Sequence, residues 1–182
     1  MRVLSGSAGG RPLKGPAIPG ARPTSELVRG AIFNVLGPLD GRIVRVVDLF
    51  AGTGSLGIEA LSRGVPQADF VESNRRQCQR IHENLRALGL SQDALVHCRE
   101  ATQAVHELEG PYQLVLMDPP YRMTDLTPVL GPLGEAPGLE AGGMVVVGHS
   151  KRVELADSYG SLSRTSGRRY GDSMVDFFVK EG

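Results

Sequence analysis

The sequence predicts an α/β fold with a largely parallel sheet. Strand-sized apolar runs alternate with stretches of helical periodicity through the middle of the chain, and such a series builds parallel strands joined by helices. The helix expected from Asn74 illustrates the pattern, because its apolar residues Cys78, Ile81 and Leu85 recur at helical spacing and it stops at Gly89. The expected strands cover residues 44–48, 68–72, 94–98, 113–118 and 143–148, and the expected helices cover residues 55–63, 74–88, 101–108 and 124–133.

The two ends of the chain depart from this series. Beyond Ser150 two strands follow without a helix between them, over residues 162–170 and 174–180, which predicts a terminal hairpin and brings the sheet to seven strands. At the other end, residues 3–13 predict a small β-hairpin broken by glycines. A helix over residues 25–36 follows, with Thr24 expected as its N-cap and Gly37 as its stop.

Length and composition fit one enzyme-sized domain with a small extension. A chain of 182 residues is long enough to bury a sizeable core, and we expect an N-terminal extension over residues 1–40 and a main domain over residues 41–182. The apolar runs fall well short of the roughly 20 residues that span a membrane, and the first residues lack the apolar core of a signal peptide. We therefore expect a cytoplasmic monomer without membrane contact.

The sulfur and imidazole side chains give no sign of a metal site. Four histidines are scattered without the spacing of metal ligands, so no metal is expected. Cys78 and Cys98 could pair in principle, but in a reducing compartment buried free thiols are the expected state.

Charge is balanced overall but uneven along the chain. The net charge of zero argues against a generally basic RNA-binding protein. Residues 1–45 nevertheless carry seven Lys or Arg side chains against two acidic ones, in a stretch rich in Gly and Pro. A basic segment of this kind suits contact with phosphates, and a solvated arm that pins the fold is the alternative.

The most informative motif is Asp118-Pro119-Pro120-Tyr121, which lies at the carboxyl end of an expected strand, where open α/β sheets bind ligands. The two prolines stiffen the backbone and leave carbonyl oxygens free to accept hydrogen bonds. The exocyclic amino group of a nucleobase needs such acceptors for its two hydrogens and an aromatic face on which the base stacks. A strand followed by a simple turn is the alternative, since Asp and Pro are common in turns.

A glycine motif follows the expected strand 44–48. Gly52, Gly54 and Gly57 spell G-x-G-x-x-G, and Glu72 ends the next strand twenty positions after Gly52. An NAD-dependent oxidoreductase is therefore a serious alternative, and a carboxylate at Glu72 would bind the ribose of NAD or of S-adenosylmethionine equally well. Asp48, four residues before Gly52, suits a cationic amino-acid moiety and would lie poorly against a pyrophosphate.

Together the two motifs resemble S-adenosylmethionine-dependent methyltransferases that modify amino groups of bases. The resemblance extends over nearly the whole chain to the bacterial 16S ribosomal RNA guanine-N2 methyltransferase family, through Ser5-Gly6-Ser7-Ala8-Gly9-Gly10-Arg11, Arg22-Pro23-Thr24-Ser25, Val28-Arg29-Gly30-Ala31-Ile32-Phe33-Asn34 and Arg169-Tyr170-Gly171-Asp172. Two positions depart from the family pattern. Gly30 stands where the family usually has Glu, and Gly148 stands where an acidic residue is frequent.

The resemblance implies a fold and a reaction. The fold is a Rossmann-like class I methyltransferase whose last strand enters the sheet antiparallel, with residues 41–182 as catalytic domain and residues 1–40 as an RNA-contacting extension. The reaction places one methyl group from S-adenosylmethionine on the N2 amino group of a guanine. The implied partner is 16S ribosomal RNA or an assembly intermediate of the small subunit.

Roles follow for the residues of the motifs. The Asp118 carboxylate and the Pro119 carbonyl would accept the amino hydrogens and, with Pro120 and Tyr121, form the catalytic site. Tyr121 would stack on the guanine, a core aromatic being the alternative. Asp48 is expected at the methionine part of the cofactor and Glu72 at its ribose. The expected cofactor residues are Asp48, Phe50, Ala51, Gly52, Thr53, Gly54, Glu72, Ser73, Glu100 and Ala101, and the expected RNA contacts are Arg11, Arg22 and Arg29.

Three other functions are open to a chain with these motifs. They are an amino-methyltransferase acting on DNA adenine or on a protein glutamine, the NAD-dependent oxidoreductase, and a non-catalytic module that binds RNA or adenosine ligands. A basic arm without a separate base-reading domain favours RNA over DNA, where specificity normally needs elements that read a groove. A glutamine-modifying enzyme would more often carry Asn at position 118.

Overall fold

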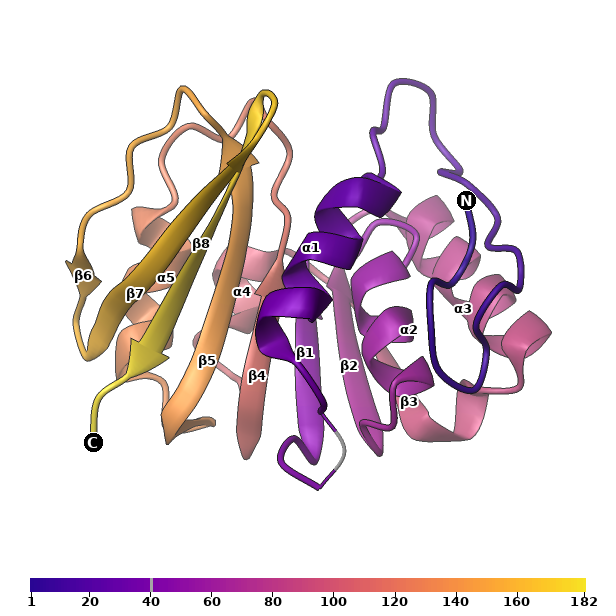
Figure 1. Ribbon diagram of the computed structural model, residues 1–182, viewed down its shortest axis with the longest axis horizontal. Coiled ribbons are helices and arrows are strands. Elements are labelled where there is room, and N and C mark those ends of the chain that lie inside the picture. The colour runs from indigo at the N-terminus through magenta and orange to yellow at the C-terminus, as the bar shows by residue number, and fades with distance from the viewer. Residues whose placement is uncertain (40) are drawn as a thin grey trace.

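The computed structural model describes residues 1–39 and 41–182, and its centre is one mixed sheet (Figure 1). The strands are β1 (Arg45–Leu49), β2 (Gln67–Glu72), β3 (Ala94–Cys98), β4 (Tyr112–Met117), β5 (Leu139–Ser150), β6 (Ser158–Tyr159), β7 (Leu162–Tyr170) and β8 (Ser173–Lys180). They lie in the order β3-β2-β1-β4-β5-β8-β7-β6. Strands β1 to β5 are parallel, while β8 is antiparallel to both of its neighbours, β5 and β7.

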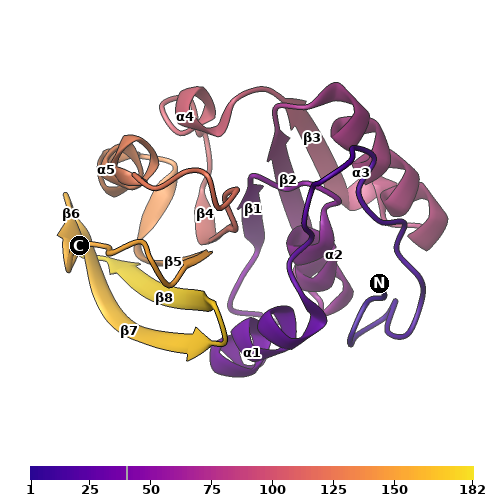
Figure 2. The same cartoon turned by 90° about the horizontal axis from the view of Figure 1, so that it is seen from above.

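Helices cover both faces of the sheet (Figure 2). One face carries α1 (Glu26–Leu36), α2 (Ser55–Ser62) and α3 (Arg75–Leu88), and the other carries α4 (Ala101–Ala104) and α5 (Thr127–Glu135). Successive residues of a strand therefore enter different cores. Val46 packs on the α1 side and Val47 on the α5 side, which explains why the central strands read as continuous apolar runs. Within the described residues, no helix has the length and apolar character needed to cross a membrane.

The fold predicted from sequence is confirmed in its main features. Each expected strand and helix of the central series is present, and the terminal hairpin inserts β8 antiparallel between β5 and β7. The sheet has eight strands instead of seven, because residues 158–159 form β6 and pair with the start of β7. A strand of two residues is too short to produce an alternating pattern, so the sequence did not predict it.

Two expectations for the N-terminal part are wrong in detail. The predicted hairpin over residues 3–13 is reduced to a single antiparallel bridge between Arg2 and Pro12. Helix α1 is capped by Ser25, whose hydroxyl accepts a hydrogen bond from the Val28 N–H at 3.2 Å, and Thr24 is not its N-cap. The Thr24 hydroxyl has a different partner in the functional site.

The N-terminal segment, residues 1–25, runs along α3 before α1 begins. The Lys14 N–H donates to the side chain of Asn84 at 2.9 Å, and the Ala17 N–H donates to the side chain of Gln77 at 2.7 Å. The same Asn84 donates to the Thr53 carbonyl in the loop after β1 at 3.0 Å. The segment thus passes from the end of α3 to its beginning and arrives at the carboxyl edge of the parallel strands, where Figure 1 shows it as the loop above the sheet. The expected domain boundary falls at residue 40, outside the described residues.

A buried ion pair fixes the first residues and α1 to α2. Glu59 of α2 is 1% exposed and accepts from the backbone N–H groups of Leu4 and Ser5 and from Arg63. Arg29 of α1 is fully buried, with its Nε 3.7 Å from the Glu59 carboxylate. Burial lowers the pKa of Arg29, and the nearby Glu59 charge opposes that shift. Arg29 is therefore part of the core on the α1 side.

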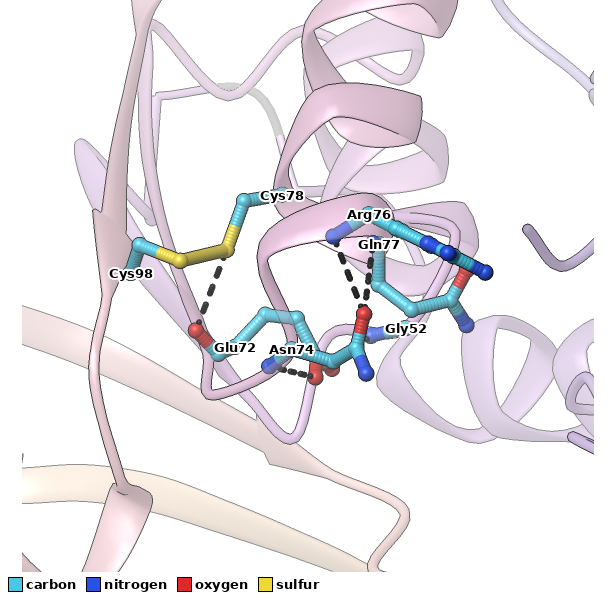
Figure 3. Close-up of a disulfide and its surroundings, with 7 residues drawn as sticks. All are labelled: Gly52, Glu72, Asn74, Arg76, Gln77, Cys78 and Cys98. Atoms are coloured by element: carbon cyan, nitrogen blue, oxygen red, sulfur yellow. Dashed lines mark hydrogen bonds between the residues drawn. A yellow bond between two sulfur atoms is a disulfide. The ribbon is translucent and has the colours of Figure 1, made fainter. Parts of the chain in front are cut away.

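The two cysteines form a disulfide, against the expectation of free thiols. Cys78 lies in the first turns of α3 and Cys98 ends β3, with their Cα atoms 6.0 Å apart (Figure 3). The helix starts just after β2 and packs back over the neighbouring edge strand β3, which brings the two side chains together. This proximity depends on strand order, which the local sequence pattern does not contain.

We predict that Arg29→Met destabilises the protein by about 3 kcal/mol, because it leaves a buried carboxylate without one of its two cationic partners. Urea denaturation measures the effect. Arg2→Met is the control, since Arg2 is exposed and should change stability by less than about 0.5 kcal/mol. An Arg29→Met protein as stable as the parent would contradict the structural role.

Candidate active site

Three carboxylates meet at the edge where the parallel strands end. Asp48 is the last residue but one of β1, Glu72 ends β2, and Asp118 directly follows β4. In the sheet register Asp48 lies between Phe70 of β2 and Leu116 of β4. Glu72 and Asp118 are each two residues further along, so all three carboxylates belong to the face covered by α1, α2 and α3. The result is a concentrated negative charge at one edge of the sheet.

The loop between β1 and α2 has an unusual backbone. Phe50 has a φ of 61°, a left-handed conformation that side chains other than glycine rarely adopt, and Gly52 and Gly54 have φ values of 57° and 81°. The Ala51 N–H donates to the Val71 carbonyl at 2.9 Å and ties the loop to β2. A Cβ atom at Gly54 would lie 3.2–3.3 Å from three apolar side chains of the core, so the core packs closely against the loop at this glycine. Strained backbone of this kind is typical of ligand sites.

Asp48 supports the start of α2. The helix begins after Gly54, which has no side chain to cap it, and the Asp48 carboxylate accepts instead from the Gly57 N–H at 2.9 Å. Asp48 is only 1% exposed. Burial raises the pKa of Asp48 to about 8, and the charges of Asp118 and Glu72 add to the rise, while the Gly57 N–H opposes it.

Glu72 holds the glycine loop from the neighbouring strand. One carboxylate oxygen accepts from the Gly52 N–H and the other from the Asn74 N–H, each at 2.8 Å. Figure 3 shows Glu72 between Gly52 and Asn74 at the start of α3. Each oxygen keeps a further direction in which it could accept from a ligand hydroxyl. Of the other expected cofactor residues, Ser73 and Glu100 are exposed and Ala51, Thr53 and Ala101 are buried.

Asp118 lies between Thr24 and β5. The Thr24 hydroxyl donates to Oδ2 of Asp118, which links the N-terminal segment to the end of β4. A Cβ atom at Gly148 would lie 2.7 Å from Oδ1 of Asp118, so the absence of a side chain at Gly148 makes room for the carboxylate. Burial raises the pKa of Asp118, and the Thr24 hydrogen bond and the positive charges of His149 and Arg22 oppose the rise.

Tyr121 stands at the outer side of the same motif. Its ring is 40% exposed, its hydroxyl shares a hydrogen bond with the Ser173 hydroxyl at the start of β8, and the Arg22 guanidinium lies 5.8 Å from the ring centroid. Between Asp118 and Tyr121, Pro119 is buried and Pro120 is exposed. The motif therefore presents a half-exposed aromatic ring beside a half-buried carboxylate.

The three arginines expected to bind RNA do not lie together. Arg22 is exposed at the site, over Tyr121. Arg11 donates to the carbonyls of Ala87 and Leu88 at the end of α3, which lies at the opposite edge of the sheet. Arg29 is fully buried, so the expectation that it contacts RNA is wrong. Its spacing on α1 places it toward the core, where Glu59 is its partner.

Sequence reasoning did not find the role of Thr24 at Asp118, the pair His149–Asp176, or the contact of Gly148 with Asp118, although Gly148 was noted as a departure from the family pattern. His149 Nε2 lies 2.7 Å from a carboxylate oxygen of Asp176, and both side chains are buried beside the end of β5. Thr24 was visible in the Arg22-Pro23-Thr24 motif but was assigned to a helix cap. Among residues 1–39 and 41–182, no group of three or more His, Cys, Asp or Glu side chains is placed to hold a metal ion.

The sheet order, with an antiparallel strand between β5 and β7 and a glycine loop after β1, is that of a class I methyltransferase. The family model described as "Conserved hypothetical protein 95" matches residues 1–179, and the chain belongs to this family.

A Bacillus subtilis relative, "Putative rRNA methyltransferase YlbH", is 40% identical over the full length of both chains. "Ribosomal RNA small subunit methyltransferase D" of Escherichia coli is 37% identical over 67% of this chain and 61% of its own length. The solved structure of "Putative methyltransferase yhhF from Escherichia coli" is 28% identical, with a TM-score of 0.84 over 100% of this chain and 98% of its own.

We predict that Asp48→Asn makes the ligand-free protein less sensitive to pH. A carboxyl group whose pKa is raised in the folded state binds more protons there than in the unfolded chain, so stability falls as pH rises from about 4 to about 8. Asn keeps an oxygen for the Gly57 N–H and removes the titration. Thermal melting at pH 5 and pH 8 should show a smaller fall in Tm for the variant than for the parent. Equal falls would contradict the raised pKa of Asp48.

Proposed function

We propose that the protein uses S-adenosylmethionine to methylate the N2 amino group of a guanine in the ribosomal RNA of the small subunit. The observation that carries the proposal is the Asp118-Pro119-Pro120-Tyr121 motif at the same sheet edge as the glycine loop, with a carboxylate that already accepts from a hydroxyl donor. The names of the relatives support ribosomal RNA as the substrate class. The choice of guanine N2 comes from the sequence resemblance and the chemistry of the motif.

The residues at the edge fit S-adenosylmethionine better than a dinucleotide. Three carboxylates on one face favour a ligand with positive charges, and a pyrophosphate would be repelled there. The space above Gly52 is open, since a Cβ atom there would find no atom closer than 4.0 Å. Glu72 would accept from the ribose hydroxyls, and Glu100 or Ala101 would lie beside the adenine. Asp48 would lie at the methionine part, whose positive charge would lower the raised pKa of Asp48 and favour its ionised form. When bound, the cofactor supplies an electrophilic methyl group on its sulfonium.

Asp118 and Pro119 would activate the nucleophile. The lone pair of an exocyclic amine is conjugated with the base, and two acceptors for its hydrogens favour a more tetrahedral, more nucleophilic nitrogen. They also stabilise the positive charge that develops on nitrogen as the new bond forms. Pro119 has no N–H, so only its carbonyl faces a donor, and Pro120 stiffens the turn. Positioning is the main contribution of the chain, because the displacement needs the amine in line with the methyl group.

Tyr121 and Arg22 would receive the base and its flanking phosphate. A guanine must leave its stack to reach Asp118. The exposed Tyr121 ring beside this carboxylate would compensate for the lost stacking by stacking on the base. Ser173 fixes the ring through the Tyr121 hydroxyl, and Arg22 adds a positive charge at the ring face. These features are shared with methylation of adenine N6, so the identity of the base is decided by experiment.

The deciding experiment incubates the protein with labelled S-adenosylmethionine and either 16S ribosomal RNA or partly assembled small subunits, and maps the modified nucleotide. Label on a guanine N2 supports the proposal. Label on adenine, on DNA or on a protein glutamine would replace the substrate assignment. Calorimetry with NAD in place of S-adenosylmethionine tests the oxidoreductase alternative, and tight NAD binding would overturn the methyltransferase assignment.

We predict that Asp118→Ala lowers the rate of methyl transfer by at least roughly 10²-fold and leaves S-adenosylmethionine affinity nearly unchanged, because this carboxylate faces the nucleophile. Asp118→Asn keeps one acceptor oxygen but loses the charge and adds a donor. A slow Asn variant means that the charge is required, whereas a fast one means that a neutral acceptor suffices. Single-turnover assays separate these cases. A parental rate in Asp118→Ala would rule out the mechanism.

We also predict that Thr24→Val shifts the acid limb of the pH–rate profile to higher pH. Asp118 must be ionised to accept both amino hydrogens, so activity is lost as pH falls through its pKa. The Thr24 hydroxyl favours the ionised form, and its removal raises that pKa further. Thr24→Ser keeps the donor and should leave the acid limb in place. The profiles of kcat/KM against pH provide the measurement, and identical acid limbs in Val and Ser variants would contradict the role of Thr24.

A further inference from the structure

Asp118 belongs to a row of four positions that crosses the sheet. Gly148 of β5 faces Asp118 directly, since a Cβ atom at Gly148 would lie 2.7 Å from its Oδ1. Gly148 pairs with Val175 of β8, and Val175 pairs with Arg168 of β7. Paired residues of antiparallel strands point to the same face. Arg168 therefore lies on the face of the sheet that carries the Asp118 carboxylate.

Arg168 is free to bind a ligand at that position. Val175 is fully buried on the α1 side, whereas Arg168, one strand further out, is exposed. Within residues 1–39 and 41–182 it takes part in no ion pair. Three strand spacings separate its backbone from that of Asp118, which is about 14 Å. Figure 2 shows the end of β7 beside α1.

A second exposed arginine lies near the target position. Arg22 lies over the Tyr121 ring, and the Thr24 hydroxyl next to it reaches Asp118. Two exposed guanidinium groups, neither of them in an ion pair among the described residues, thus lie near the place where the base would enter. The acidic side chain at the tip of the terminal hairpin, Asp172, is neutralised by Lys151. The first turn of α1 carries one exposed carboxylate, Glu26, which accepts from the Arg2 N–H at 3.2 Å.

We propose that Arg168 binds a phosphate of the RNA segment that flanks the target nucleotide, so that the RNA backbone runs across the first turn of α1 from Arg22 to Arg168. This inference rests on the proposed function, because it takes the base at Asp118 as given. A planar guanidinium pairs with phosphate in two hydrogen bonds, and an exposed arginine without a protein partner suits that role. The flanking RNA is single-stranded, since the target base leaves its stack.

The chain provides a matched control next to Arg168. Arg169 follows it on the same strand, is equally exposed, and pairs with Met174, so it points to the opposite face. Its Nε donates to the Gly171 carbonyl at 2.9 Å. Substitution of either arginine removes one positive charge from the same hairpin. Only the loss of Arg168 removes a charge from the face of Asp118.

The test measures binding of a short single-stranded RNA of mixed sequence, labelled with a fluorophore, to the full chain over a series of salt concentrations. Arg168→Ala should weaken binding and reduce the slope of log affinity against log salt by about 0.7, the value for one phosphate contact with a single strand. Arg169→Ala should leave the slope unchanged, and Arg168→Lys should restore most of it. In methylation of 16S ribosomal RNA, Arg168→Ala should raise KM and keep kcat.

The outcomes separate the two proposals. If the parent methylates ribosomal RNA and Arg168→Ala keeps the parental slope and KM, the path across α1 is wrong and the proposed function stands. If Arg168→Ala and Arg169→Ala lose the same slope, the effect is general charge and the inference is also overturned. If the parent transfers no methyl group to any RNA, the proposed function fails. Melting curves of the variants confirm that the exposed substitutions leave the fold intact.

Discussion

The parallel register of β1 with β2 and β4 is the constraint on which the site depends. It brings Asp48, Glu72 and Asp118 to one edge and one face of the sheet, where their charges repel one another. Burial is the main reason that the pKa of Asp48 is raised to about 8, and the charges of Asp118 and Glu72 add to the rise. A site in which burial raises the pKa of both Asp48 and Asp118 suits a positively charged ligand, because such a ligand favours the ionised form of each carboxyl group.

Each carboxylate is held by a donor from another part of the fold. Asp48 accepts from the first turn of α2, Glu72 accepts from the glycine loop, and Asp118 accepts from Thr24 in the N-terminal segment. These bonds compensate part of the desolvation of the charges. The bond from the Gly52 N–H to Glu72, with that from the Ala51 N–H to the Val71 carbonyl, ties the loop after β1 to β2 beside Phe50 in its left-handed conformation. The same contacts that stabilise the charged edge therefore shape the ligand site.

The sequence predicted those features that local pattern determines. The strands, the glycine loop and the motif after β4 are contiguous in sequence, and the edge at which parallel strands end follows from their alternation with helices. Arg29 and Arg11 show where this reasoning stops. Both are basic residues in a Gly-rich segment, but their partners lie in α2 and at the end of α3, and no local signal identifies a partner 30 or 76 residues away. The disulfide was missed for the same reason, because it depends on β3 lying beside β2 under α3.

The N-terminal segment joins the fold and the site in a way that neither the sheet nor the motifs reveal alone. It is fixed to α3 through Asn84 and Gln77, it crosses above the glycine loop, and it ends at Asp118 through Thr24. Arg22 is only two residues from Thr24. A phosphate bound at Arg22 would therefore contact the same short stretch of chain that donates to Asp118. In the proposed function, binding of RNA at this arginine would therefore act on the position of the Asp118 carboxylate. The Thr24 hydroxyl opposes the rise in the pKa of Asp118 that burial causes, so the same segment would also favour the ionised, accepting carboxylate that the proposed reaction needs.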